Sequence, residues 1–279
     1  MNIGIVGQGF VGSAIRAGLE DYYKVLTYDI DEKKSNSTHY QVVAKSNIIF
    51  LCLPTPMRTS GKCDTRILEK EIEKVSKEAK EQRVKPILVI KSTIPPGTTE
   101  RISKNTHLDL CFSPEFLTEA NSFSDFKNQT RIIIGGPRPA TGMIKQMFRK
   151  AFPTIPIVKT GTKTAEMVKY FTNCFLATKV TFANEMYDLC EVTKIDYDKV
   201  CEYALYDTRI GKTHLAVPGP DGDRGFGGHC FPKDLAAIIF HAKTLGLEAN
   251  FLEEVECTNE KFRTNRDWES MKGRAVSDD

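Results

Sequence analysis

The chain has 279 residues, of which 41% are hydrophobic and 27% are charged, and its formal net charge is +3. This composition is typical of a globular protein with one large domain or two smaller ones, and so small a charge does not suggest nucleic acid or a membrane surface as a partner. No apolar run is long enough to span a bilayer, and the opening MNIGIVGQGF lacks the basic segment of a signal peptide.

The first half alternates apolar strands with amphipathic helices. Strands are expected at 2–6, 23–28, 47–53, 86–90, 109–112, 131–134 and 155–158, and helices at 11–19, 65–82 and 140–150. This alternation predicts an α/β fold over residues 1–160, a Rossmann-type, doubly wound and mainly parallel sheet covered by helices on both faces.

The pattern changes near residue 160. A helix without Pro or Gly is expected at 162–192 and another at 196–205, followed by the loop VPGPDGDRGFGGH and helices at 232–245 and 249–262. We therefore predict an all-helical second domain over 161–262. The stretch 263–279 reads as a charged tail, which we expect to be poorly ordered.

The eight cysteines, at positions 52, 63, 111, 174, 190, 201, 230 and 257, include no CxxC pair. Most lie in apolar segments, so we expect buried, reduced thiols in a cytosolic protein rather than disulfides, and no metal site. Cys230 stands apart because Gly227 and Gly228 precede it and Pro232 marks the start of a helix after it. A thiolate would be stabilised at that helix N-terminus beside Lys233, although a buried structural thiol is the alternative.

The first expected strand and helix are joined by the glycine sequence G-Q-G-F-V-G, which contains Gly7, Gly9 and Gly12. In a dinucleotide-binding loop, such glycines form a tight turn, let the backbone approach a pyrophosphate, and pack helix against strand. Phe10 and Val11 would begin the helix, whose N-terminus favours phosphate. The flanking strand and helix make this signal much stronger than glycines alone.

Asp29 ends the second expected strand, at the distance from the glycines where an acid accepts hydrogen bonds from the adenosine ribose. Its charge would repel a 2′-phosphate, so NAD is favoured over NADP. Lys33 and Lys34 lie close by and weaken this inference, because a lysine would pair with such a phosphate.

The string VPGPDGDRGFGGHCFPKD resembles the signature of the UDP-glucose/GDP-mannose dehydrogenase family, and most of all that of its UDP-glucose 6-dehydrogenases. KSTIPPGT at 91–98, SPEFLTEAN at 113–121 and AEMVKYFTN at 165–173 agree with it. The resemblance covers nearly the whole chain. It implies an NAD-dependent, two-step oxidation of a sugar alcohol to a carboxylate, UDP-glucose to UDP-glucuronate, in which a cysteine captures the aldehyde as a thiohemiacetal and then a thioester.

The resemblance also implies which residues form the site. Among the catalytic residues, Cys230 would be the nucleophile, and Lys169 and Asn173 would contact the oxyanion. Glu115 would act as acid and base, and Thr93 and Asp234 would position a water molecule. Besides the glycine loop and Asp29, the cofactor contacts would be Lys34, Thr55, Thr93, Glu119 and Lys233. The substrate contacts would be Glu115, Phe116, Leu117, Lys169, Asn173, Arg209, Leu215, Gly219 and Gly227. Arg209 would reach the substrate of a neighbouring subunit, which predicts a homodimer, with the long helix as its interface.

The chain departs from the family at its C-terminus, because the usual members continue into a second nucleotide-binding-like domain. We expect a short form, with a fragment of a longer chain as the alternative. Three readings of function stay open. The enzyme would oxidise UDP-glucose or another sugar nucleotide, such as GDP-mannose or a UDP-N-acetylhexosamine. The two other readings are a single-step β-hydroxyacid dehydrogenase and a non-catalytic NAD-binding protein.

Overall fold

The computed structural model describes residues 1–277. Contacts among Cα atoms divide the chain into two compact units. The first unit comprises Met1–Thr55 and Thr65–Lys169, and the second comprises Pro56–Asp64 and the chain from Tyr170 onward. Each unit has its own hydrophobic core.

The first unit is built on a seven-stranded sheet in the order β2-β1-β3-β4-β5-β6-β7. The strands are β1 (Asn2–Val6), β2 (Lys24–Tyr28), β3 (Ile48–Leu51), β4 (Ile87–Ile90), β5 (Leu110–Phe112), β6 (Ile132–Gly135) and β7 (Ile157–Thr160). Every pairing is parallel except that of β5 with β6. The predicted Rossmann-type, mainly parallel sheet is confirmed. The chain leaves β1 toward β2 on one side and β3 on the other, which creates a switch point where such sheets bind ligands.

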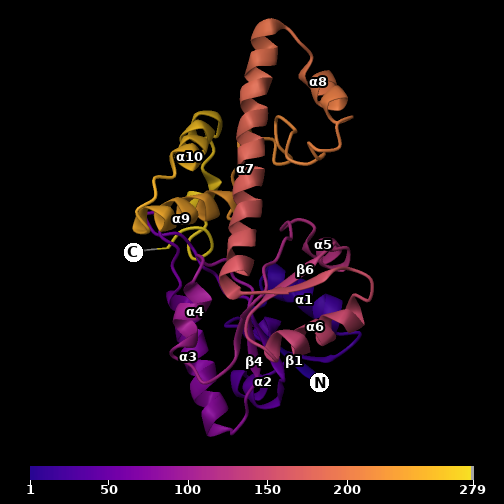
Figure 1. The fold of residues 1–279 in the computed structure, drawn as a ribbon, viewed down its shortest axis with the longest axis vertical. Coiled ribbons are helices and arrows are strands. Elements are labelled where there is room, and N and C mark those ends of the chain that lie inside the picture. The colour runs from indigo at the N-terminus through magenta and orange to yellow at the C-terminus, as the bar shows by residue number, and fades with distance from the viewer. Residues whose placement is uncertain (278–279) are drawn as a thin grey trace. The chain divides into compact units, whose positions relative to one another are not determined.

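Helices cover both faces of this sheet because successive strand residues point to opposite faces. Ile48 and Phe50 of β3 pack with α1 (Phe10–Leu19), α5 (Ser122–Lys127) and α6 (Ala140–Ala151). Ile49 and Leu51 pack on the other face with α2 (His39–Lys45), α3 (Arg66–Glu81) and α4 (Thr98–Ser103). Figure 1 shows α3 and α4 on one side of the strands and α1 and α6 on the other.

The ends of the expected strands and helices are confirmed to within two residues. The sequence analysis did not predict α2, α4 and α5, which have only six or seven residues each. So short a helix contains too few turns to show the 3.6-residue repeat. The capping box of α2, in which Thr38 and Gln41 bond each other's backbone, was the one readable signal.

His39 on α2 joins that helix to α3. Its ring nitrogens contact the carboxylates of Glu78 at 2.9 Å and Glu71 at 2.5 Å, and the residue is only 6% exposed. Burial by itself lowers the pKa of His39, but the two glutamates outweigh it and the net effect is a raised pKa. The imidazolium therefore holds together two carboxylates that would otherwise repel each other.

We expect His39→Gln to destabilise the protein by about 2 kcal/mol at pH 6, the range of a hydrogen bond to a charged group. Because the folded-state pKa of His39 is raised, its contribution is fully present below the unfolded pKa and is lost as pH rises through the folded pKa. Urea unfolding of both proteins from pH 6 to 9 should show the difference shrinking. A difference that grows with pH would contradict this, and His107→Gln, at an exposed histidine, is the control.

The second unit is helical. It holds α7 (Thr162–Thr193) from Tyr170 onward, α8 (Tyr197–Ala204), α9 (Phe231–Thr244) and α10 (Asn250–Phe262). α9 and α10 pack side by side (Figure 1). Two apolar clusters form its core, one around Tyr170, Leu235 and Val255, and one around Tyr197 and Val217. None of the helices within residues 1–277 combines the length and the apolar character needed to cross a membrane.

The expectation of a poorly ordered tail is wrong for residues 263–277. Arg263 is 2% exposed, Trp268 in a 3₁₀ turn (Asp267–Ser270) is 4% exposed, and Ala275 is fully buried. The backbone N–H of Met57 donates to Ala275 and that of Ser277 donates to Met57. The error came from taking charge as a sign of exposure, whereas the charges here are paired. Residues 278–279 lie outside the described part.

All eight cysteines are present as thiols. Cys63, Cys111, Cys174 and Cys190 are buried as expected. Cys257 is exposed on α10, so the expectation of burial is wrong for it. The polar residues around it, Glu256 and Thr258 among them, were the available signal that it lies on the solvent side of the helix.

Candidate functional site

The absence of a side chain serves a different purpose at each of the three N-terminal glycines, as the sequence predicts. Gly7 has φ +90°, and a Cβ there would overlap the carbonyl of Cys52. A Cβ on Gly12 would overlap the carbonyl of Gly7, so this glycine lets α1 pack against the turn. A Cβ on Gly9 would meet nothing within 4 Å, which leaves open space at the loop.

The start of α1 is suited to an anion. Gly9 is its N-cap and has no side chain to cap the helix, and its first turn, which contains Phe10 and Val11, carries no acidic residue. Helix N-termini present amide N–H groups and the positive end of the helix dipole. With open space at Gly9, these features fit the pyrophosphate of a dinucleotide.

Asp29 follows β2 directly and is fixed by two backbone groups. Its carboxylate accepts hydrogen bonds from the N–H of Gln8 at 2.6 Å and of Asp31 at 2.9 Å. Carboxylate oxygens have further lone pairs, so Asp29 remains able to accept hydroxyl groups of a ribose. Lys34 lies in a 3₁₀ turn (Glu32–Lys34) with its ammonium 3.7 Å from Asp31, and its side chain is half exposed.

We expect Gly9→Asp to abolish tight NAD binding while leaving the fold intact. Aspartate is a favoured N-cap residue, and its charge would stand where the pyrophosphate binds. Juxtaposed like charges cost several kcal/mol, so affinity should fall by about a hundredfold or more. Calorimetric titration with NAD measures this, and thermal unfolding without NAD checks the fold.

Gly9→Asn is the matched control, because it adds nearly the same volume and the same capping ability without charge. The asparagine variant should retain more affinity than the aspartate variant. Equal affinities for the two variants, or an unchanged affinity in Gly9→Asp, would show that the pyrophosphate does not bind at this helix end.

Thr55 and Thr93 follow the neighbouring strands β3 and β4, at the carboxyl edge of the sheet. The Thr55 hydroxyl donates to the Thr93 carbonyl at 2.7 Å, and both residues are buried. Because β3 is also next to β1, this pair lies at the edge where the switch point occurs. The structure thus brings together two residues that the sequence assigned separately.

Glu115 and Lys169 form a buried ion pair. The ammonium of Lys169 donates to Oε1 of Glu115 at 3.0 Å and to its carbonyl at 2.8 Å, and the two side chains are 5% and 8% exposed. The other carboxylate oxygen accepts the N–H of Leu117 at 2.6 Å. Burial raises the pKa of Glu115, but Lys169, Leu117 and then Lys91 outweigh it and keep the pKa below its usual value.

Lys91 is a candidate that the sequence analysis did not single out. It is 6% exposed, and its ammonium donates to the carbonyl of Pro114 at 3.0 Å, next to Glu115. Burial, assisted by Lys169 and opposed by Cys52 and Glu115, lowers the pKa of Lys91 to about 8. A lysine that directly follows the apolar strand sequence ILVI was the available signal.

A cavity of about 290 Å³ in the first unit collects several predicted residues. Val11 of the glycine loop lines it with Glu115, Phe116, Leu117 and Lys91. The structure therefore brings one predicted cofactor residue together with three predicted substrate residues. Glu119 lies beyond them, exposed in the turn before α5.

Cys230 is the N-cap residue of α9, with Pro232 in the first turn. Its carbonyl accepts the N–H of Asp234 at 3.0 Å. The side chain of Asp234, 1% exposed, accepts from Asn173 at 2.6 Å and from Lys233 at 2.5 Å. Four predicted residues from α7 and α9 thus lie in one polar cluster of the second unit.

Lys233 supplies the positive charge of this cluster and is paired with the carboxylate of Asp234. Burial would lower the pKa of Lys233, but Asp234 and the thiols of Cys230 and Cys63 raise it, and the net pKa is raised. Lys233 therefore stays an ammonium beside the thiol at the start of α9. Both the ammonium and the helix N-terminus stabilise a thiolate there.

The remaining predicted substrate residues lie in the loop between α8 and α9. The carbonyl of Leu215 accepts the Tyr197 hydroxyl at 2.7 Å, and the N–H of Gly219 donates to Asp223 at 2.8 Å. Gly227 packs so closely against Arg263 that a Cβ would overlap it. Arg209 is 88% exposed and pairs with Asp207, so within one chain the structure does not bring it to the other predicted residues.

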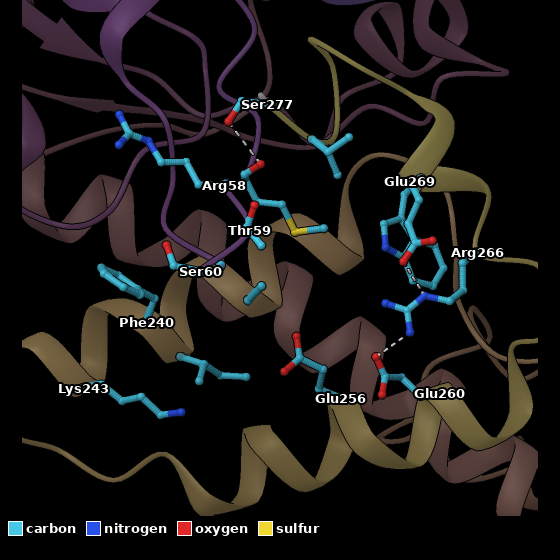
Figure 2. Close-up of a pocket in the computed structure, with 16 residues that line it drawn as sticks. Arg58, Thr59, Ser60, Phe240, Lys243, Glu256, Glu260, Arg266, Glu269 and Ser277 are labelled. Carbon is cyan, nitrogen blue, oxygen red and sulfur yellow. Dashed lines mark hydrogen bonds and ion pairs between the residues drawn. The ribbon is translucent and has the colours of Figure 1, made fainter. Parts of the chain in front are cut away.

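A second cavity, of about 500 Å³, lies in the second unit among residues 57–61, α9, α10 and the last turns of the chain (Figure 2). Among the described residues, its lining includes none that the sequence predicts for the site. Figure 2 shows Arg266 between Glu260 and Glu269, which it contacts at 2.9 Å and 2.7 Å.

Comparison with known proteins gives the class of this fold and site. The UDP-glucose/GDP-mannose dehydrogenase family's NAD-binding domain matches residues 34–152, and its central domain matches 163–261. UDP-glucose 6-dehydrogenase TuaD of Bacillus subtilis is 30% identical over 99% of this chain and 68% of its own length. An uncharacterised protein of Methanocaldococcus jannaschii, MJ1054, is 33% identical over 91% of the chain, which spans about a third (32%) of that protein.

A solved structure agrees in fold. The UDP-glucose dehydrogenase of Pyrobaculum islandicum superposes with a TM-score of 0.84 at 28% identity, over 93% of this chain and 68% of that one. These matches place the chain among NAD-dependent oxidoreductases. The chain belongs to the UDP-glucose/GDP-mannose dehydrogenase family, and NAD is its cofactor.

Proposed function

We propose that the protein oxidises the sugar primary alcohol of UDP-glucose to the carboxylate of UDP-glucuronate, in two NAD-dependent steps. The observation that supports this most is Cys230 at the N-terminus of α9, beside the ammonium of Lys233. A single oxidation of an alcohol requires no nucleophile, whereas oxidation of an aldehyde does. Bound NAD would supply the acceptor for the hydride that each oxidation releases.

The chain's own residues account for the intervening chemistry. The alcohol first loses a hydride and a proton to become an aldehyde. The Cys230 thiolate then adds to the carbonyl carbon, which gives a thiohemiacetal after the oxygen gains a proton. Loss of a second hydride and of that proton leaves a thioester, and attack by water releases the carboxylate and the thiol.

The buried polar residues are suited to the proton and charge transfers of these steps. Glu115, whose pKa is kept below its usual value, is ionised at neutral pH and would accept a proton from the attacking water. Lys169 and Asn173 would donate to the sugar oxygen that becomes negative when the thiolate or water adds. Asp234 and Thr93 would position the water, and Phe116 and Leu117 would hold the substrate through their backbone.

A homodimer through α7 belongs to the same proposal. From Tyr170 onward, this helix exposes large apolar side chains: Phe171 at 72%, Phe175 at 56%, Phe182 at 60%, Leu189 at 53% and Val192 at 81%. Their spacing of three, four and seven residues places them along one side of the helix. A second copy would cover this apolar stripe, and Arg209 of each copy would reach the substrate of the other. Gel filtration with light scattering at working concentration tests it, and a monomer would contradict it.

The test of the proposed function is to count NADH against sugar consumed, with excess NAD and limiting UDP-glucose. Two NADH per sugar are expected, and one would indicate a single-step dehydrogenase. If UDP-glucose gives none, GDP-mannose and UDP-N-acetylhexosamines are tested next, since the family includes GDP-mannose dehydrogenases. Tight NAD binding without turnover on any of them would favour a non-catalytic protein.

A further inference from the structure

The loop before Cys230 is held by residues that follow it far along the chain. This loop, 219–228, is rich in glycine and contains Gly225 and Gly228, both at positive φ. Glycine-rich backbone has many accessible conformations, so a fixed position for the loop must be imposed by its neighbours.

Asn259 on α10 makes the first of these contacts. Its side chain accepts the N–H of Phe226 at 2.7 Å and donates to the carbonyl of the same residue at 3.0 Å. A Cβ on Gly225 would come too close to that amide oxygen. Asn259 thus substitutes for a backbone partner of Phe226.

Arg263 makes the second contact. Its side chain is 1% exposed, and its guanidinium donates to Asp221 at 2.6 Å and to Asp267 at 3.0 Å. Asp223 lies 3.6 Å away. Burying a charge is unfavourable unless it is paired, so the arginine ties the aspartates of the loop to Asp267.

Asp267 completes the set by bonding the loop backbone itself. Its two carboxylate oxygens lie 3.1 Å and 3.2 Å from the N–H of Gly228, two residues before Cys230. Gly227 packs against Arg263 and Asp267 so closely that a Cβ would overlap both. The 3₁₀ turn that carries Asp267 is itself anchored, because Trp268 is 4% exposed.

We propose that Asn259, Arg263 and Asp267 form a clamp that positions Cys230 and the loop 219–228 that precedes it. They are positioning residues, acting through Gly228 and Phe226 rather than on the substrate, and the inference rests on the proposed function of Cys230. The clamp fixes the direction in which the chain enters α9. The thiol of Cys230 is thereby held at the N-terminus of α9.

The test compares Asp267→Ala with Glu269→Ala in the 279-residue chain. Both changes remove one carboxylate from the same turn, but Glu269 pairs with Arg266 and is 56% exposed. Two readouts need no turnover. These are hydrogen exchange of the peptide spanning 225–230, and the pH at which alkylation of Cys230 by iodoacetamide is half-maximal, followed by peptide mass spectrometry. The third readout is kcat with UDP-glucose. The Kd of NAD is measured in parallel.

Asp267→Ala should speed exchange at 225–230 about tenfold or more and shift the alkylation midpoint upward, since the thiolate loses its placement at the helix end. The value of kcat should fall by about a hundredfold, as for a displacement of about 1 Å, with the Kd of NAD unchanged. Glu269→Ala should resemble the wild type in all of these measurements. Should Asp267→Ala fold poorly, Asp267→Asn, which keeps the shape and loses the charge, replaces it.

The clamp is refuted if Asp267→Ala matches Glu269→Ala in exchange and in alkylation. It is also refuted if the loop loosens while kcat stays at the wild-type value, because the position of the loop would then not matter. If the wild-type protein releases no NADH from UDP-glucose, the proposed function fails for that sugar, while exchange and alkylation still decide whether the clamp exists.

Discussion

Cys230→Ser is expected to lower the rate of NADH release by on the order of 10³-fold or more, the range seen when a catalytic nucleophile is removed. A serine hydroxyl at the start of α9 does not ionise near neutral pH, so it cannot capture the aldehyde as the thiolate does. The count of two NADH per UDP-glucose should fail with it. Stopped-flow and end-point absorbance of NADH measure both.

Cys257→Ser is the matched control, because it makes the same substitution at an exposed thiol of α10 and should leave the rate unchanged. Cys230→Ala adds a second comparison. A single-step dehydrogenase would survive both changes at position 230 with one NADH per substrate. Full activity in Cys230→Ala would therefore remove the thioester from the mechanism.

Lys169→Met is expected to destabilise the protein by about 3–5 kcal/mol at pH 7, since it leaves the carboxylate of Glu115 buried without its main partner. Glu115 has a lowered pKa, so the stability it gains from pairing is present above the unfolded pKa and is lost as pH falls through the folded pKa. The difference between wild type and variant should therefore shrink in acid. Urea unfolding at pH 7 and below measures it.

Two further variants isolate the cause. Lys169→Met/Glu115→Gln should recover part of the lost stability, because no uncompensated charge remains. Lys163→Met, six residues earlier on α7, breaks an exposed ion pair with Glu100 and should not measurably change the stability. If the double variant is no more stable than Lys169→Met, the loss comes from packing and not from the buried charge.

The sheet could be predicted from the sequence because its signals are local. Strands such as IIFL and ILVI are apolar throughout, which is what a parallel strand buried on both faces requires. The glycine loop could also be read, since its neighbours in sequence supply the strand and the helix. These features depend on residues that are close together in the chain.

Contacts between distant residues could not be predicted in the same way. Glu166 is fully buried at the start of α7 and caps the N-terminus of α4 by accepting from the N–H groups of Gly97 at 2.6 Å and Thr99 at 2.8 Å. Nothing near Glu166 in the sequence distinguishes it from a solvated helix acid. Lys91 and Arg263 were missed for the same reason, because their partners lie far along the chain.

For the site residues as well, their identity could be predicted but their contacts with one another could not. The resemblance to the family named Cys230, Lys169, Asn173, Glu115 and Asp234 one by one. It did not show that Asn173 and Lys233 would share the carboxylate of Asp234, or that Leu117 would hold Glu115 by its N–H. The chemical roles of these residues stay predictions until the variants above are measured.

The pairing of Asp221 with Arg263 also has a consequence for the order in which the protein matures. Synthesis delivers Cys230 and its glycine loop before α10 and the turn that carries Asp267. Contacts that span some 40 residues of chain (221 to 263 and 228 to 267) form only after those later segments exist. The Cys230 thiol is therefore made early and placed late, so a nascent chain that stops short of Asp267 carries the proposed nucleophile without the contacts of the proposed clamp.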